Sequence, residues 1–164
     1  MKTIFGYSYY SEIDLAFQIC EVAFKNKVDK GGNPYINHVR GVYNRLKDKG
    51  YRNEILVVGI LHDLLEDCPE WTAEMLSIFF RPCIVESVLA LTRQPKQTNA
   101  EYLNQLIYDR WAVRVKQADL EDNMNITRLN GITEQDRIRL LRYKEMHKTI
   151  SQLIKSQDTI KAII

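Results

Sequence analysis

Apolar residues recur at three- and four-residue steps along nearly the whole chain, which is the spacing of amphipathic helices. The steps are clear after Ser11, after Pro34 and after Thr133, where the last long helix is predicted to begin. The predicted inner stripe of that helix is Ile138, Leu141, Ile150 and Ile154. No β-hairpin signal and no repeat interrupts the pattern. We therefore predict an all-α fold, a compact helical bundle in which residues 1–164 form one domain.

Several helix ends are marked by residues with known capping preferences. Ser11 and Thr72 are predicted N-caps, and the segment that begins at Thr98 has the signature of a capping box. Pro82 suits the first turn of a helix. Residues 54–67 are predicted to form one continuous helix that follows an asparagine cap. These signals divide the chain into helices of ordinary length.

Size and charge narrow the class of protein. The 164 residues, with 45% hydrophobic and 27% charged side chains, match one ordinary globular domain. A chain of this length buries about two-thirds of its unfolded surface, which is enough for one core. The formal net charge is only +2, whereas a dedicated nucleic-acid binder usually shows a strong basic excess. Local basic clusters remain compatible with a small phosphorylated ligand.

The chain shows no signal that directs it to a membrane or out of the cell. Its first residues lack the apolar stretch of a signal peptide, and its longest apolar run, 55–61, falls far short of the roughly 20 residues that span a bilayer. Cys20, Cys68 and Cys83 form no CxxC pair and are expected to be free thiols in a reducing compartment. We expect a cytoplasmic protein with no membrane partner, and we leave the oligomeric state open.

The block His62-Asp63-x-x-Glu66-Asp67 carries candidate chemistry. On a helix these four positions cover an arc of about 140° at ~100° per residue, with His62 over Glu66 and Asp63 over Asp67. The preceding run, 55–61, is apolar all round, which indicates a buried helix. Three carboxylates and an imidazole at the end of a buried helix are costly unless a cation or a water-filled cleft compensates them. The alternative is a solvated helix end with an acidic cluster.

Two further blocks add candidate ligands. His38 follows Pro34 by about one helical turn, and Asp119 shares a helix face with Asn123, although a single aspartate is most often a surface or cap residue. The combined set of two imidazoles and two carboxylates suits a divalent transition ion such as manganese or iron better than a structural zinc: His38, His62, Asp63 and Asp119. Glu66 and Asp67 remain for proton transfer and water activation.

These blocks, in this order, carry a family resemblance. Gly-Asn-Pro-Tyr-Ile-Asn-His over 32–38, His-Asp-x-x-Glu-Asp over 62–67 and Lys-Gln-Ala-Asp-x-x-x-Asn-Met over 116–124 resemble the HD-domain metal-dependent phosphohydrolases. Within that family they are similar to the RelA/SpoT-type alarmone hydrolases, whose small stand-alone members are closest in size. The similarity runs from about Leu15 to about Tyr143. A lone His-Asp pair is a weak signal, but three ordered blocks are a specific one.

The resemblance implies a compact HD-type helical bundle and a role for each matching position. It implies that a metal, usually Mn²⁺, is held by His38, His62, Asp63 and Asp119. The implied catalytic acidic pair is Glu66 and Asp67. The implied substrate-binding residues are Lys30, Asn123 and Tyr143. The implied reaction is hydrolysis of the 3′-pyrophosphate of guanosine tetra- or pentaphosphate, which yields GDP or GTP and pyrophosphate.

The chain also departs from that family. Asp29 stands where the alarmone hydrolases usually have an arginine that stacks on guanine, and a carboxylate there would repel phosphate. The pair 121–122 is acidic where relatives are more neutral or basic, and His147 is predicted to lie on the surface. Candidate replacements for the missing positive charge are Lys25, Lys27, Arg93 and Lys96. Two alternatives therefore stay open: hydrolysis of another nucleotide, and catalytically silent nucleotide binding.

Overall fold

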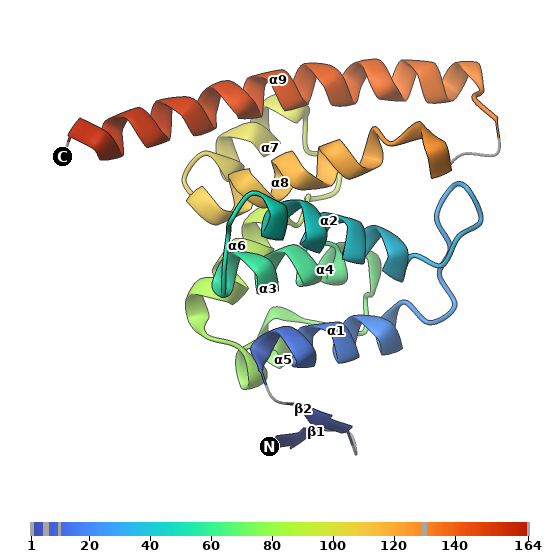
Figure 1. Ribbon diagram of the computed structural model, residues 1–164, viewed down its shortest axis with the longest axis vertical. Helices are drawn as coiled ribbons and strands as arrows, with labels where there is room; N and C mark the ends of the chain where they lie inside the picture. Colours follow the sequence, from blue (N-terminus) through green and yellow to red (C-terminus); the bar gives the residue numbers. More distant parts are fainter. Residues whose placement is uncertain (1, 5–6, 10, 129–130, 164) are drawn as a thin grey trace.

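A computed structural model describes residues 2–4, 7–9, 11–128 and 131–163 of the chain. Nine α-helices make up most of this part of the chain (Figure 1). Their bounds are α1 (Glu12–Ala23), α2 (Ile36–Asp48), α3 (Glu54–Leu61), α4 (Leu64–Asp67), α5 (Ala73–Phe79), α6 (Pro82–Leu91), α7 (Asn99–Leu106), α8 (Arg110–Asn123) and α9 (Glu134–Ile163). A short 3-10 helix, Ile126–Arg128, lies between α8 and α9. The all-α fold class is confirmed.

Helix α3 forms the centre of the bundle. It packs against α1, α2, α6 and α8, and every residue from Leu56 to Leu61 is buried. Gly59 lets α2 approach closely, since a Cβ atom there would lie 2.3 Å from a side-chain carbon of Leu46. This confirms the prediction that 55–61 is a buried helix. In the described part of the chain, no helix is long and apolar enough to cross a membrane.

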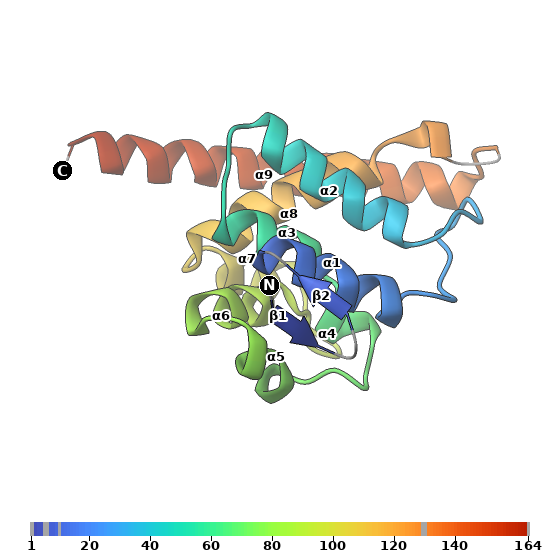
Figure 2. The same cartoon turned by 60° about the horizontal axis from the view of Figure 1, so that its bottom comes forward.

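Helix α9 is much longer than the others and lies along α8 (Figures 1 and 2). Two residues of its predicted inner stripe, Ile150 and Ile154, are buried as expected. The prediction is wrong for the other two, because Ile138 is 45% exposed and Leu141 is 61% exposed. The side chains that pack against the core in their place are Tyr143, Met146 and Leu153. This stripe keeps to the 3.6-residue period along the helix, which the predicted stripe does not.

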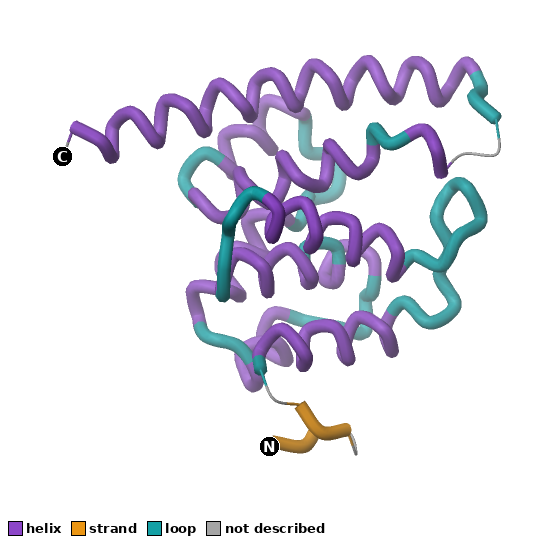
Figure 3. The backbone as a smooth tube through the Cα atoms, viewed as in Figure 1, coloured by secondary structure: helices purple, strands orange, loops and turns teal. Residues whose placement is uncertain are grey.

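A short antiparallel hairpin precedes the bundle, so the expectation of a chain without a β-hairpin is wrong. Strands β1 (Lys2–Ile4) and β2 (Tyr7–Tyr9) pair with Lys2 opposite Tyr9 and Ile4 opposite Tyr7. Three-residue strands are too short to show an alternating pattern, although these segments hold β-branched and aromatic residues that favour strands. The hairpin lies at the edge of the bundle beside α1 (Figure 3), so it leaves the fold class unchanged.

The capping predictions are confirmed except at Asn53, whose side chain makes no cap hydrogen bond at the start of α3. The side chains of Ser11 and Thr72 cap α1 and α5, Thr98 forms a complete capping box with Glu101, and Pro82 opens α6. The continuous helix over 54–67 is wrong, because α3 ends at Leu61 and α4 begins only at Leu64. His62 and Asp63, which carry the candidate chemistry, form this junction. The regular helix is therefore interrupted at the site itself.

Candidate active site

Four predicted metal ligands converge from three parts of the fold. His38 lies on α2, His62 and Asp63 lie at the α3–α4 junction, and Asp119 lies on α8. Ligand atoms of the first three lie within 4.8 Å of one another, and the Nε2 atoms of the two histidines are 3.3 Å apart. Asp63 Oδ2 is 2.9 Å from His62 Nε2, and Asp119 Oδ1 is 3.2 Å from His38 Nε2. The structure therefore brings the whole predicted set together.

The opposite ring nitrogens fix how the two histidines face the cluster. His38 Nδ1 donates to the Asp122 carboxylate over 2.7 Å, and His62 Nδ1 donates to the Gly59 carbonyl oxygen over 2.9 Å. A carboxylate and a carbonyl accept hydrogen bonds, so both Nδ1 atoms carry hydrogen and both Nε2 atoms face the cluster. Metal-binding histidines usually show this arrangement, with the second nitrogen held by an oxygen.

The electrostatics of the two imidazoles reflect the carboxylates around them. Burial alone would lower the pKa of His38, but hydrogen bonds to Asp119, Asp122 and Asp63 outweigh it and raise that pKa well above its ordinary value. Burial also opposes the charge on His62, yet the Asp63 carboxylate and the Asp119 hydrogen bond raise the pKa of His62 to about 9. A divalent cation bound at the Nε2 atoms would displace these protons, because a metal-binding imidazole is neutral.

The two carboxylates show the reverse shift. Burial favours their neutral forms, but the His62 charge and hydrogen bonds from the two histidines hold the pKa of Asp63 far below its ordinary value. For Asp119, the Lys116 ammonium and the histidines lower the pKa in the same way. Ionised carboxylates and imidazole nitrogens, buried and aimed at one point, are the donors that a divalent transition ion requires. The residues present therefore fit a metal site.

Three side chains hold the carboxylate ligands in place. Tyr35 donates its hydroxyl hydrogen bond to Asp63. Lys116 Nζ lies 2.7 Å from Asp119 Oδ2, and Asn123 Nδ2 donates to Asp119 Oδ1 over 2.5 Å. Lys116 and Asn123 are one helical turn from Asp119 on either side, so the local geometry of α8 places both beside it.

Asp122 is expected to tune the cluster without touching a metal. It is buried between His38 and Gly41, where an added Cβ would meet its carboxylate at 2.3 Å, so the close approach of α2 and α8 confines it. Asp122→Asn keeps the shape but weakens the hydrogen bond to His38, and we expect metal affinity to fall by about 10- to 100-fold. Calorimetric titration with Mn²⁺ measures this. Glu121→Gln is the control, because Glu121 pairs with Lys49 and His147 instead; equal affinity losses in both variants would contradict the role of Asp122.

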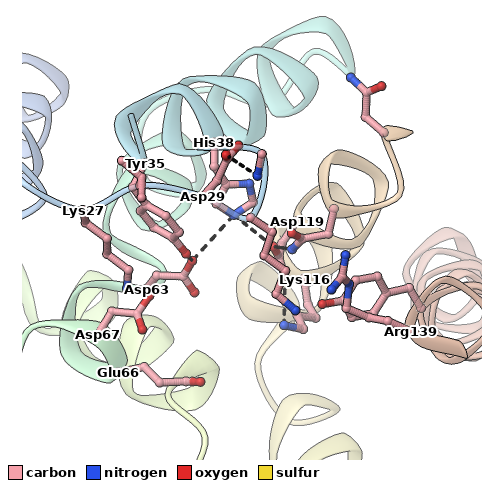
Figure 4. Close-up of a pocket in the computed structure, with 16 residues that line it drawn as sticks. Lys27, Asp29, Tyr35, His38, Asp63, Glu66, Asp67, Lys116, Asp119 and Arg139 are labelled. Carbon is pink, nitrogen blue, oxygen red and sulfur yellow. Dashed lines mark hydrogen bonds and ion pairs between the residues drawn. The ribbon is translucent and has the colours of Figure 1, made fainter. Parts of the chain in front are cut away.

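The acidic pair lies next to the cluster, at the end of α4 (Figure 4). Glu66 accepts a hydrogen bond from the Arg93 backbone N–H over 2.9 Å. Asp67 forms an ion pair of 2.5 Å with Lys27, whose ammonium also sits 4.4 Å from the centre of the Tyr35 ring. Both carboxylates line the same pocket as three of the predicted metal ligands, His38, Asp63 and Asp119. The acidic pair and the predicted ligands therefore border the same space.

The pocket has a volume of about 370 Å³ and opens beside the cluster. The three predicted substrate-binding residues, Lys30, Asn123 and Tyr143, all line it. Lys116 and Arg139 add positive charge to the wall. In Figure 4, Arg139 approaches from the side opposite Asp67. The pocket thus offers cations on several sides, a tyrosine ring and an amide, which together suit a phosphorylated nucleoside.

Asp29 has a structural role that the sequence did not indicate. Its Oδ1 atom accepts hydrogen bonds from the backbone N–H groups of Gly31 and Asn33, each over 2.9 Å, and so shapes the loop at the pocket rim. Gly32 adopts φ +81° within this loop. Among the candidate replacements for the missing positive charge, Lys27 lines the pocket, whereas Lys25, Arg93 and Lys96 are not among its lining residues.

Sequence reasoning missed several residues of this site. Lys116 and Asp122 lie three residues before and after Asp119, and this helical spacing was the signal that could have indicated them. Tyr35 stood within the first block, but nothing local to it indicated a bond to Asp63. Lys27 and Arg139 had no local signal. His147 is half-buried and bonds Glu121 over 3.1 Å, so it is not the plain surface residue expected from the sequence.

The fold and the site define a class: an all-helical domain with a buried His–Asp cluster. No family model matches the chain. The fold is that of a solved metazoan ortholog of SpoT, described as hydrolysing ppGpp and acting in starvation responses; the match has a TM-score of 0.70 and 18% identity and covers 96% of this chain and 100% of that one.

Sequence relatives agree with the structural match. The bifunctional (p)ppGpp synthase/hydrolase SpoT of Escherichia coli K12 is 29% identical over 119 residues, which covers 66% of this chain. Guanosine-3′,5′-bis(diphosphate) 3′-pyrophosphohydrolases of Escherichia coli O157:H7 and Shigella flexneri match equally, at 29% identity. The chain spans 17% of the length of these curated relatives. The resemblance to SpoT-type hydrolases expected from the sequence is thus confirmed.

Proposed function

We propose that this chain is a metal-dependent phosphohydrolase that removes the 3′-pyrophosphate of guanosine tetra- or pentaphosphate, with residues 1–164 acting as one domain. The observation that carries the proposal is the convergence of a buried His–Asp cluster and an acidic pair in one cation-lined pocket. The similarity to SpoT and to a metazoan SpoT ortholog supports the choice of substrate.

Mn²⁺ is the proposed ion, because two imidazole nitrogens and two carboxylate oxygens form a mixed donor set of intermediate hardness. The proposed ligands are His38, His62, Asp63 and Asp119. When bound, such an ion polarises a phosphoryl oxygen and lowers the pKa of water. The chain's own contribution is to hold these donors in place: Asp122 and the Gly59 carbonyl orient the rings, and Lys116 and Tyr35 orient the carboxylates.

Glu66 and Asp67 are the proposed proton-handling pair. Water attacks the phosphorus atom attached to the 3′ oxygen. The bond between this phosphorus and the 3′ oxygen breaks, and pyrophosphate is released. Glu66 takes the proton of the attacking water and returns it to the departing 3′ oxygen, while Asp67 orients the water. Desolvation in the pocket, together with the charges of Asp63 and Asp67, raises the pKa of Glu66 against the opposing hydrogen bond from Arg93. A general base works best when its pKa lies close to the working pH.

The proposed substrate contacts are Lys30, Asn123 and Tyr143. Tyr143 offers a flat ring to the base or sugar, Asn123 offers a neutral donor and acceptor, and Lys30 offers charge to a phosphate. Lys27 and Arg139 add cations on opposite sides of the pocket. A substrate with phosphates on both the 5′ and 3′ oxygens would use cations placed in this way.

The test is an assay of the purified protein with Mn²⁺ against guanosine tetraphosphate and a panel of other nucleotides. Pyrophosphate and orthophosphate are followed separately. Release of pyrophosphate from guanosine tetraphosphate, at a higher kcat/KM than any other substrate, is the expected result. Faster release of orthophosphate from another nucleotide would assign the site to a different substrate. Saturable nucleotide binding without turnover of any substrate would leave only a binding protein.

The pH profile provides a separate prediction. Because the raised pKa of Glu66 favours its neutral form, the charged base is lost at a higher pH than for an ordinary glutamate. We expect kcat to be full above that pKa and to fall about tenfold per pH unit below it, with the protein kept saturated with Mn²⁺. Glu66→Gln is expected to flatten this acidic limb. A limb that persists in Glu66→Gln would assign the titration to another group.

A further inference from the structure

A second cavity, of about 360 Å³, lies away from the His–Asp cluster. Its wall comes from the segment before α3 and from the first turns of α3, α8 and the far end of α9: Tyr51, Ile55, Arg110, Trp111, Arg114 and Asp158. None of these residues lines the pocket beside the cluster. Arg110 and Asp122 stand at opposite ends of α8, about 18 Å apart along the axis at ~1.5 Å per residue. In Figure 1 the two ends of α8 lie far apart in the bundle.

The cavity wall carries an excess of positive charge. The Arg114 side chain is only 6% exposed; it donates to the Arg110 carbonyl and to Gln157, each over 3.0 Å, and pairs with Asp158. Arg110 lies 3.6 Å from the same Asp158 carboxylate. Two guanidinium groups therefore share one carboxylate, which is itself 55% exposed on α9. The carboxylate of Asp109, the residue before Arg110, accepts hydrogen bonds from two backbone N–H groups of α8 and from the Ser87 hydroxyl.

The rest of the wall is aromatic and aliphatic. Tyr51, Ile55 and Trp111 pack against the core with part of their surface while also lining the cavity. A flat ring favours stacking on a planar base, and a guanidinium favours a phosphate through paired hydrogen bonds. Small-molecule sites typically combine such apolar walls with a few charged groups in a concave space of this size.

We propose that this cavity is a second ligand site, which takes a small aromatic anion of the nucleoside phosphate class. The base lies against Trp111 and Tyr51, and the phosphate replaces Asp158 as the partner of Arg110 and Arg114. The site is distinct from the proposed active site, and its occupation requires no hydrolysis. Its test is therefore independent of the test of the function proposed above.

The chain offers a direct reporter for this site. It contains two tryptophans, so Trp71→Phe leaves Trp111, in the cavity wall, as the sole indole. The experiment follows the fluorescence of Trp71→Phe protein during titration with guanosine 5′-monophosphate, guanosine and ribose 5-phosphate. We expect saturable change with the nucleotide and at least tenfold weaker binding of the two fragments, because each lacks one of the two recognised groups.

Matched arginine variants locate the binding. In the Trp71→Phe background, Arg110→Ala is expected to weaken binding about tenfold, since it removes one charge-assisted contact from an exposed side chain. Asp158→Asn is expected to tighten binding, because it removes the competing carboxylate. Arg139→Ala, in the other pocket, is expected to leave the titration unchanged. Absence of saturable change, or loss of the signal with Arg139→Ala but not with Arg110→Ala, would overturn the proposal.

Discussion

Replacing Asp119 with asparagine is expected to abolish Mn²⁺ binding and hydrolysis together. Asp119 is 3% exposed, and its Oδ1 lies 3.2 and 3.7 Å from the Nε2 atoms of His38 and His62, so the substitution removes one of the two carboxylates that face both rings. The substitution also leaves the Lys116 ammonium without its carboxylate partner. Removing one partner of a buried ion pair costs about 3–5 kcal/mol, so the free energy of unfolding is expected to fall as well.

A double variant separates these two consequences. Lys116→Met with Asp119→Asn removes the stranded ammonium, so it is expected to recover part of the unfolding free energy lost in Asp119→Asn alone. Metal binding is expected to stay lost in both variants. Metal binding is measured by calorimetric titration, stability by urea unfolding, and Glu145→Gln on the exposed face of α9 is the control. Asp119→Asn protein that still binds Mn²⁺ with parental affinity would exclude Asp119 as a ligand.

The parts of the fold that sequence predicted best are those encoded locally. Ser11, Thr72 and Thr98 cap their helices because a side-chain oxygen needs only the next helical turn as its partner. The break between α3 and α4 was missed because neither glycine nor proline marks it in the sequence. The predicted stripe of α9 failed at Ile138 and Leu141 for a local reason, since these two positions fall outside the 3.6-residue period that the buried Ile150 and Ile154 follow.

The candidate site follows the same division. Each histidine and aspartate of the cluster stood in a short block with recognisable spacing, and the structure brings the four together. Asp122 looked like an acidic departure from the family, but burial makes it the partner of His38. The meaning of Asp29 also changed, because its carboxylate is bonded to its own loop. Lys27 and Arg139 reach the pocket from segments more than 100 residues apart, a proximity that local spacing does not encode.

Glu66→Gln and Asp67→Asn are expected to lower kcat by about 10²- to 10⁴-fold while Mn²⁺ affinity stays within about twofold of the parent. Both carboxylates line the pocket, and within the described part of the chain their bonds go to groups outside the histidine–aspartate cluster: Glu66 accepts from the Arg93 backbone N–H, and Asp67 pairs with Lys27. Their loss therefore removes proton handling and water orientation without dismantling the metal site.

The acidic pair has matched controls in the same segment. Glu70→Gln removes an exposed carboxylate three residues beyond Asp67 and is expected to keep parental kcat and metal affinity. Lys27→Met tests whether the ion pair matters to Asp67: it is expected to lower kcat less than Asp67→Asn does, because the carboxylate remains and loses only its partner. Single-turnover rates with Mn²⁺-saturated protein separate the chemical step from product release. If Glu66→Gln and Asp67→Asn turn over like Glu70→Gln, the acidic pair is only the solvated end of α4, and the proton must move through another group in the pocket.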